Sequence, residues 1–239
     1  MAYLLHIETA TRVCSVALSE NDRLIALREN DTEAYSHSSL LTVYMEAVMK
    51  EAGISAGSLD AVAVSMGPGS YTGLRIGVSA AKGLCYGLDL PLIAVDTLEA
   101  MTYYCREQVS KHPAILPVEA KEIIYCPMID ARRMEVYTCL FDSGLGRIRD
   151  IEAVIVDADS FSDLPTNKTM LFFGDGAEKC KNIISRTPSF FLDGITTSAS
   201  GLTAPVYKKF LQKDFVDTAY FEPFYLKDFV AGKPKVKGL

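Results

Sequence analysis

A glycine-rich loop at residues 65–77, with the sequence SMGPGSYTGLRIG, is the stretch of this chain best suited to bind a charged ligand. Gly67 and Gly69 follow a continuous apolar segment at residues 59–65, which predicts a buried strand, and Ser70 precedes an expected helix. Glycine tolerates backbone conformations that turn amide groups outward, and the N-terminus of a helix favours anions. One interpretation of the loop is therefore a cradle for phosphate.

The loop departs from the two standard phosphate-binding templates. The interval between Gly69 and Gly73 is one residue too long for the GxGxxG pattern of dinucleotide-binding folds. The P-loop pattern fails because the loop contains no lysine, and the next one along the chain is Lys82. Small residues continue into the following helix: Gly73, Gly77, Ala80 and Ala81. The second interpretation is a tight turn whose small residues let the helix pack closely on another helix. The residue types alone favour neither interpretation over the other.

Two carboxylates are candidates for holding Mg²⁺ in an ATPase or kinase. Glu8 and Asp130 each end an apolar strand, and such enzymes need acidic ligands between their lobes. Carboxylates that end strands are also common for purely structural reasons. A peptidase would need a hydroxyl beside a base; Ser36 and His37 are adjacent, but neighbouring side chains at a helix start diverge.

The sequence shows no metal-binding pattern. Its three histidines, His6, His37 and His112, have no spacing typical of a ligand pair, and its six cysteines form no CxxC motif. We therefore expect no metal site, and we expect the cysteines to be buried free thiols.

The composition is that of an acidic globular protein. Its 24 basic and 30 acidic residues give a net charge of −6, so we do not expect the main RNA-binding surface here, the basic tail of Lys233, Lys235 and Lys237 being a weak exception. No apolar run approaches the ~20 residues of a membrane-spanning helix. The N-terminus also lacks the features of a signal peptide. We expect a cytoplasmic protein without membrane contact.

Hydrophobic periodicity predicts an α/β chain. In the first half, strands are expected at residues 3–9, 13–19, 23–29, 59–65 and 91–95, and helices at residues 36–52, 72–87 and 97–109. Later elements are expected at residues 170–173, a strand, and at residues 177–185 and 203–213, both helices. This order indicates mixed sheets covered by helices.

The opening pattern returns halfway along the chain. The strand that ends in Glu8 and its hairpin partner resemble the strand that ends in Asp130 and the hairpin after it, and an expected strand at residues 148–156 completes the repeat. We infer two lobes of similar topology, at residues 1–108 and 109–239, with the final helix expected to pack back on the first lobe.

Residues 67–77, followed by the sequence AKGL, closely resemble the signature of the bacterial TsaB family, also called YeaZ. The likeness spans about residues 4–229 and includes LHIETAT at residues 5–11, DARRMEVY at 130–137, GDG at 174–176 and PFYL at 223–226. Glu8 stands where the family commonly has Asp, which preserves the carboxylate. The resemblance implies a two-lobed actin-like ATPase-domain (ribonuclease H-like) α/β fold, with mixed sheets flanked by helices.

The resemblance also implies a role in making threonylcarbamoyladenosine at position 37 of tRNA. In that system the paralogue TsaD transfers the threonylcarbamoyl group, helped by TsaB and the ATPase TsaE. TsaD carries a metal-binding His-x-x-x-His, whereas this chain has Thr97 and Met101 at the two ligand positions, and Arg12-Val13 where TsaD has acids. The implied function is a non-catalytic activating subunit; an ATPase or kinase and a glycoprotease-like peptidase are the alternatives.

The partners follow from the same resemblance. We expect a heterodimer with a TsaD-type paralogue, a TsaE-type ATPase, a homodimer when the chain is alone, and tRNA bound mainly through the complex. No cofactor of its own is expected, and ATP or ADP is expected only at the interface of the complex.

The helices at residues 36–52 and 72–87 are expected to form the partner interface. The predicted contacts combine large side chains of the first helix with small residues of the second: Leu40, Tyr44, Val48, Gly73, Gly77, Ala80 and Ala81. Each glycine costs a helix up to ~1 kcal/mol relative to alanine, which the close approach of another helix would explain. The candidates for any remaining nucleotide or phosphate contact are Glu8, Gly67, Gly69, Ser70 and Asp130.

Overall fold

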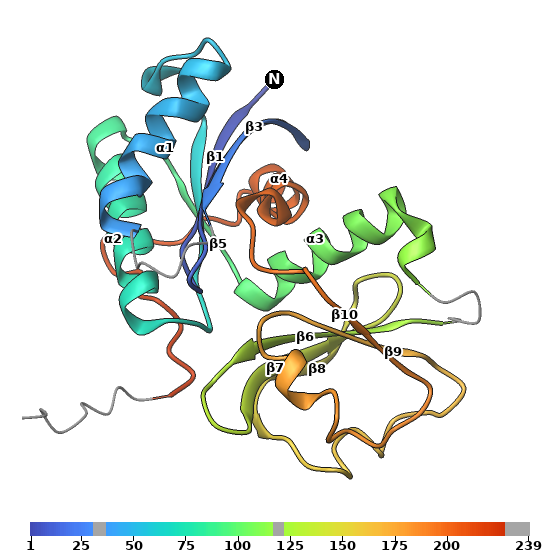
Figure 1. The fold of residues 1–239 in the computed structure, drawn as a ribbon. Helices are drawn as coiled ribbons and strands as arrows, with labels where there is room; N and C mark the ends of the chain where they lie inside the picture. Colours follow the sequence, from blue (N-terminus) through green and yellow to red (C-terminus); the bar gives the residue numbers. More distant parts are fainter. Residues whose placement is uncertain (31–36, 117–121, 228–239) are drawn as a thin grey trace, which may run out of the picture.

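Two five-stranded β-sheets form the framework of the molecule (Figure 1). The computed structural model describes residues 1–30, 37–116 and 122–227. The first sheet has the order β3-β2-β1-β4-β5, with β1 (Tyr3–Glu8), β2 (Cys14–Glu20), β3 (Arg23–Asn30), β4 (Ala61–Ser65) and β5 (Leu92–Val95). The second has the order β10-β9-β6-β7-β8, with β6 (Ile124–Asp130), β7 (Glu135–Phe141), β8 (Arg147–Ile155), β9 (Met170–Phe173) and β10 (Ser189–Leu192).

The two sheets have the same topology. In the first sheet, β1 is antiparallel to β2 and parallel to β4; in the second, β6 is antiparallel to β7 and parallel to β9. On the antiparallel side, β3 extends the first sheet and β8 the second. On the parallel side, β5 extends the first sheet and β10 the second. The internal repeat is therefore confirmed at the level of topology, and so is the predicted fold class of two mixed sheets flanked by helices.

Helices cover both faces of the first sheet, because its strands alternate apolar side chains between two cores. The α-helices of the described residues are α1 (His37–Glu51), α2 (Tyr71–Leu88), α3 (Thr97–Lys111) and α4 (Thr203–Gln212). Leu5 and Ile7 pack on the side of α1 and α2, whereas Leu4 packs on the side of α4. None of these helices is long and apolar enough to cross a membrane.

Helix α3 lies between the two sheets (Figure 1). Its Ala100 packs into the core that holds Leu4 and Val206, whereas Met101 and Cys105 pack against the second sheet. The predicted lobe boundary at residue 108 falls inside this helix, and that division stays a prediction. Helix α4 follows the second sheet in the chain and contacts β5 of the first.

One predicted helix is wrong. Residues 177–185 contain only a short 3-10 turn at Glu178–Cys180, in which the amide of Cys180 bonds to the carbonyl of Ala177, three residues back. Ala177, Cys180 and Ile184 all face the core of the second lobe, so the apolar spacing is helical although the backbone is not. Strand β10 was also not predicted.

Candidate functional site

The glycine loop between β4 and α2 packs against the chain's own backbone. Gly67 has a φ of +118°, and a Cβ atom there would lie 2.4 Å from the carbonyl oxygen of Phe224. A Cβ atom on Gly69 would lie 2.3 Å from the carbonyl oxygen of Ala10. That oxygen also accepts a hydrogen bond from the amide of Ser70 at 2.6 Å. The space beside Gly67 and Gly69 is therefore filled by carbonyl oxygens of the chain itself. The amide of Ser70, which a phosphate would need as a donor, is already hydrogen-bonded.

The first turns of α2 lie directly on the end of β1. A Cβ atom on Gly73 would lie 2.1 Å from the carbonyl oxygen of Thr9, and one on Gly77 would lie 2.3 Å from the Thr9 hydroxyl. That hydroxyl donates to the carbonyl of Gly73 at 2.8 Å, and Ser70 caps the helix by accepting from the Gly73 amide at 3.2 Å. These contacts favour close packing over a phosphate cradle. The neighbour, however, is a strand of the same lobe and not another helix.

A cleft of about 1420 Å³ opens between the lobes. Its walls come from the β1–β2 turn, the start of α2, the β6–β7 hairpin, the turn after β9 and the C-terminal segment, and include Arg12, Gly69, Ser70, Tyr71, Asp130, Arg132, Asp175, Tyr225 and Lys227. Three of the residues predicted for nucleotide contact therefore border one cleft: Gly69, Ser70 and Asp130. The other two, Glu8 and Gly67, are buried and do not line it.

Asp130, the most suitable acid in the cleft, is already paired with a cation. Its Oδ1 lies 2.5 Å from Nζ of Lys179 and accepts a hydrogen bond from the amide of Arg132 at 2.7 Å. Asp175 accepts from the amide of Asp130 at 3.0 Å, and burial raises the pKa of Asp175. A Mg²⁺ ion at Asp130 would have to displace Lys179.

Glu8 ends β1 and is fully buried. The amide of Ala10 donates to its Oε1 at 2.6 Å, while its Oε2 and the hydroxyl of nearby Ser65 lack a well-formed hydrogen bond. Burial raises the pKa of Glu8 to about 7, against the lowering effect of the Ala10 amide and the Ser65 hydroxyl. Glu8 is therefore a buried acid that is partly protonated near neutral pH.

The two positions where TsaD carries histidines take part in packing. The hydroxyl of Thr97 accepts a hydrogen bond from the amide of Gly67 at 3.2 Å, and Met101 is buried against the second sheet. His6 is buried and bonded to the Ser19 hydroxyl at 2.8 Å, and burial lowers its pKa to about 3. Within residues 1–30, 37–116 and 122–227, no three His, Cys, Asp or Glu residues are placed to hold a metal ion.

The cysteines are packing residues. All six are buried with free thiols, as predicted, and burial raises the pKa of Cys14 to about 11. Ser36, considered for a peptidase, and the tail residues Lys233, Lys235 and Lys237 lie outside the described residues.

The seven residues predicted for the partner interface stay a prediction, but four of them are buried in their own lobe: Val48, Gly73, Gly77 and Ala81. In α1 the inward stripe consists of Leu41, Met45 and Val48, at helical spacing, so the outward face falls on other positions. In α2 the two glycines face Thr9, as described above. Leu40, Tyr44 and Ala80 are half-buried at the edge of the same core.

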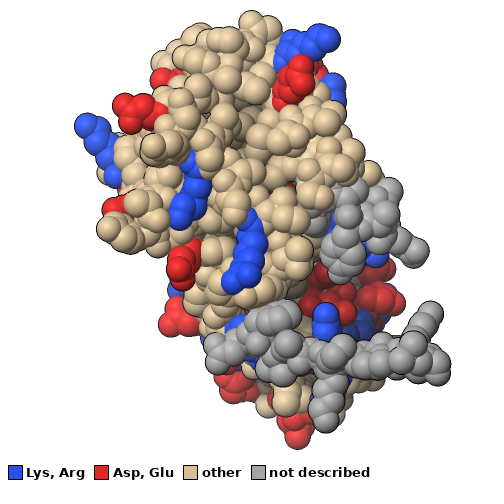
Figure 2. Space-filling model, turned by 90° about the vertical axis from the view of Figure 1, so that its left-hand side faces the viewer, with Lys and Arg blue, Asp and Glu red and all other residues tan. Residues whose placement is uncertain are grey.

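The exposed face of α1 and α2 carries other residues. Val43 is 55% exposed and Tyr86 is 89% exposed. A Cβ atom added to Gly83 or Gly87 would meet nothing within 4 Å, so the surface of α2 is open at both. Figure 2 shows this side of the molecule, where charged side chains are sparse over much of the first lobe. Such a face is suited to contact another protein.

The C-terminal segment at residues 216–227 links α2 to the second lobe. Lys82 of α2 donates to the carbonyl of Phe221 at 2.9 Å, and Lys227 forms an ion pair with Glu135 at the start of β7. Sequence reasoning identified only its PFYL motif; nothing local in the sequence indicated where the segment lies.

Comparisons with known proteins place the chain in a family. The model of the family described as TsaD, tRNA N6-adenosine threonylcarbamoyltransferase, matches residues 32–237. The tRNA threonylcarbamoyladenosine biosynthesis protein TsaB of Haemophilus influenzae is 27% identical over 241 residues, covering 96% of this chain and 95% of that protein. The protein of the same name from Bacillus subtilis is 28% identical over 237 residues, covering 94% and 93%. A tRNA N6-adenosine threonylcarbamoyltransferase of Streptococcus pyogenes is 30% identical over 147 residues, covering 52% of this chain and 42% of that protein.

Solved structures share the fold. YeaZ from Pseudomonas aeruginosa superposes with a TM-score of 0.74 at 23% identity, covering 95% of this chain and 100% of that chain. Together with the match over residues 32–237 and the nearly full-length TsaB relatives, this confirms the predicted resemblance: the chain belongs to the TsaD family, and its full-length relatives there are TsaB (YeaZ) proteins.

Proposed function

We propose that the chain is a TsaB-type subunit that takes part in the biosynthesis of tRNA threonylcarbamoyladenosine. The observation that carries this proposal is the alignment of 94% or more of the chain with relatives named for that biosynthesis. A tRNA substrate implies that the protein works in the cytoplasm.

In this proposal the chain activates its partner and performs no chemistry itself. The pairing of Asp130 with Lys179 and the burial of Glu8 support it, because phosphoryl transfer needs acids that can reach Mg²⁺ and nucleotide. Thr97 and Met101, at the positions of metal ligands in TsaD, support it as well. ATP or ADP would then bind only at the interface of the complex. An independent ATPase, kinase or peptidase has no comparable support.

The proposed partner is a TsaD-type paralogue that binds the exposed face of α1 and α2. The TsaD family model matches this chain, so the paralogue carries equivalent helices, and equivalent surfaces can pair about an approximate twofold axis. Val43 and Tyr86 offer apolar contact, and Gly83 and Gly87 leave room for a helix to approach closely. The same face would support a homodimer when the chain is alone. A TsaE-type ATPase and tRNA would join the heterodimer.

Reconstitution tests this function. Unmodified tRNA and threonylcarbamoyl-AMP are incubated with the TsaD-type paralogue and the TsaE-type ATPase of the same organism, with and without this chain. We expect modified tRNA to accumulate only when the chain is present, and the chain alone to modify none. Equal modification without the chain would overturn the proposal.

A further inference from the structure

The turn of the β6–β7 hairpin holds two arginines in a backbone conformation that arginine rarely adopts. Arg132 and Arg133 have φ angles of 71° and 51°. The turn is closed by hydrogen bonds from the Ala131 amide to the Glu135 carbonyl at 3.1 Å and from the Glu135 amide to the Arg132 carbonyl at 3.2 Å. Glycine and asparagine adopt positive φ more readily, so a turn shaped for stability alone would carry them. Two adjacent arginines in their place point to a role for the side chains.

The positive charges of this turn are not cancelled by the acids beside it. Asp130, which precedes the turn, is paired with Lys179 at 2.5 Å, and Glu135, which follows it, is paired with Lys227. Neither arginine of the turn has an ion-pair partner among the residues that the structure describes. Within the described part of the chain, the turn therefore presents two guanidinium groups without an acidic partner.

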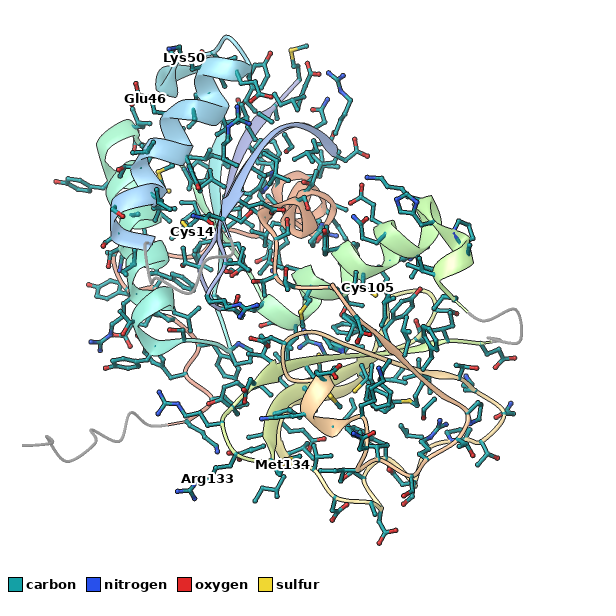
Figure 3. The ribbon with its side chains drawn as sticks, viewed as in Figure 1. Cys14, Glu46, Lys50, Cys105, Arg133 and Met134 are labelled. Carbon is teal, nitrogen blue, oxygen red and sulfur yellow. The ribbon has the colours of Figure 1, made fainter. Side chains whose placement is uncertain are left out.

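The turn lies at the mouth of the cleft between the lobes. Arg132 lines the cleft, whereas Arg133 points away from the second sheet (Figure 3). The deeper cleft walls combine the acids Asp175, Glu178 and Asp193 with the cations Arg12 and Lys227, so they offer an anion little net attraction. An anionic ligand is therefore best placed at the exposed end of the turn, where the two arginines are adjacent and accessible.

We propose that Arg132 and Arg133 contact the phosphate backbone of the tRNA, an inference that rests on the proposed function. A guanidinium group can donate two parallel hydrogen bonds to a phosphate, which makes arginine well suited to this contact. Phosphate contacts need no enclosed pocket; they position a nucleic acid without reading its sequence. With a net charge of −6, the chain can offer such contacts only in local clusters, and this turn adds to the RNA contacts of the partner.

The double substitution R132N/R133G separates charge from backbone geometry. Asparagine and glycine suit positive φ, so we expect the variant to unfold at a higher temperature than the wild type. In complex with the TsaD-type paralogue, it should bind an unmodified tRNA transcript roughly tenfold more weakly at low salt. The slope of log K against log salt concentration should shrink by roughly 1.5, because each phosphate contact contributes about 0.7 to 0.9.

Two controls accompany the measurement. Arg106→Ala removes an exposed arginine from α3 and should leave affinity and slope unchanged, whereas R132K/R133K keeps both charges and should retain most of the slope. Unchanged tRNA binding by R132N/R133G would overturn the inference and leave the proposed function standing. Loss of binding to the paralogue instead of to tRNA would assign the turn to a protein contact and would also overturn it. If the wild-type complex binds no tRNA, both the inference about the turn and the proposed function are overturned.

Discussion

The carbonyl oxygen of Phe224 occupies the space of the side chain that Gly67 lacks, 2.4 Å from where its Cβ atom would be. The amide of Phe224 also donates to the carbonyl of Met66 at 2.7 Å, so a hydrogen bond holds the C-terminal segment to the glycine loop beside this contact. A glycine pattern that resembles a phosphate cradle thus serves a contact within the chain.

Replacement of Gly67 by alanine should lower the free energy of unfolding by roughly 2 kcal/mol or more. Alanine opposes the φ of +118° and also collides with the Phe224 carbonyl. Urea titration measures the loss. Gly53→Ala is the matched control, because Gly53 has a φ of +68° but open surroundings, and only the conformational cost of about 1 kcal/mol applies there. Equal losses in the two variants would show that the Phe224 contact does not constrain the loop.

The buried acid Glu8 predicts a pH-dependent stability. Its pKa rises from 4.5 to about 7, so above pH 4.5 the folded state holds a proton that the unfolded state releases. This stabilisation is complete below pH 4.5 and is lost as the pH rises through 7. The Gln side chain of Glu8→Gln is neutral at every pH. The free energy of unfolding of this variant, taken relative to that of the wild type, should therefore increase by about 3 kcal/mol as the pH rises from 4.5 to 7.5. A difference between the two proteins that is constant with pH, in urea titrations, would contradict a neutral Glu8.

His6 lies on the same strand and acts with the opposite sign. Burial lowers its pKa from 6.5 to about 3, so below pH 6.5 the unfolded state binds a proton that the folded state does not. That stabilisation is complete above pH 6.5 and is lost as the pH falls through 3. The effects of Glu8 and His6 oppose each other between pH 4.5 and 6.5. The wild type should therefore show a shallow pH dependence there, and Glu8→Gln should show a steeper loss of stability on acidification.

The two-lobe topology could be predicted because local periodicity encodes it. The strand that ends in Glu8 and the strand that ends in Asp130 each carry their own hairpin signal, and both sheets grow around them. The apolar residues of the segment at 177–185 have helical spacing, but the segment forms no α-helix. A short 3-10 turn is enough to place these side chains in the core of the second lobe. Strand β10 has only four residues and depends on pairing with β9, which no local pattern indicates.

The sequence predicted only those residues of the candidate site that lie at the end of a strand or in the glycine loop. Asp130 ends β6 and Gly69 follows β4, and both residues line the same cleft. The cation that neutralises Asp130, Lys179, is 49 residues away, and neither its position nor its direction follows from the sequence. The exposed residues of α1 could not be told from the buried ones, because the helix has apolar residues on both sides and Val43 outside looks like Val48 inside.

The chain alone should hydrolyse ATP no faster than a buffer blank. Lys179 neutralises Asp130, and Glu8 cannot reach the cleft, so among the described residues a Mg²⁺–nucleotide complex finds no pair of free acids on opposite lobes. Phosphate release with Mg²⁺ and ATP measures this, with Lys179→Ala as a second protein that frees only one acid and should stay inactive. Turnover that Asp130→Asn abolishes would mean that the cleft is a catalytic site.

Pairing with the TsaD-type paralogue should depend on the exposed face of α1 and α2. Val43→Arg and Tyr86→Glu each place a charge in the proposed contact, and an unpaired charge there should weaken binding by roughly 100-fold, or about 3 kcal/mol. Both positions are exposed, at 55% and 89%, so the melting temperature of the isolated chain should not change. Titration calorimetry with the paralogue measures the affinity.

Two further variants separate a direct contact from a general loss of stability. Ile155→Arg makes the same kind of change at an apolar residue of β8 that is 74% exposed, and it should leave pairing unchanged. Val48→Ala removes volume from the buried side of α1 and should lower stability by about 2 kcal/mol, with only a small effect on affinity at a temperature where the protein stays folded. If the folded Val43→Arg and Tyr86→Glu variants pair as tightly as the wild type and support tRNA modification, the paralogue binds elsewhere, and the sparsely charged face of the first lobe has another occupant.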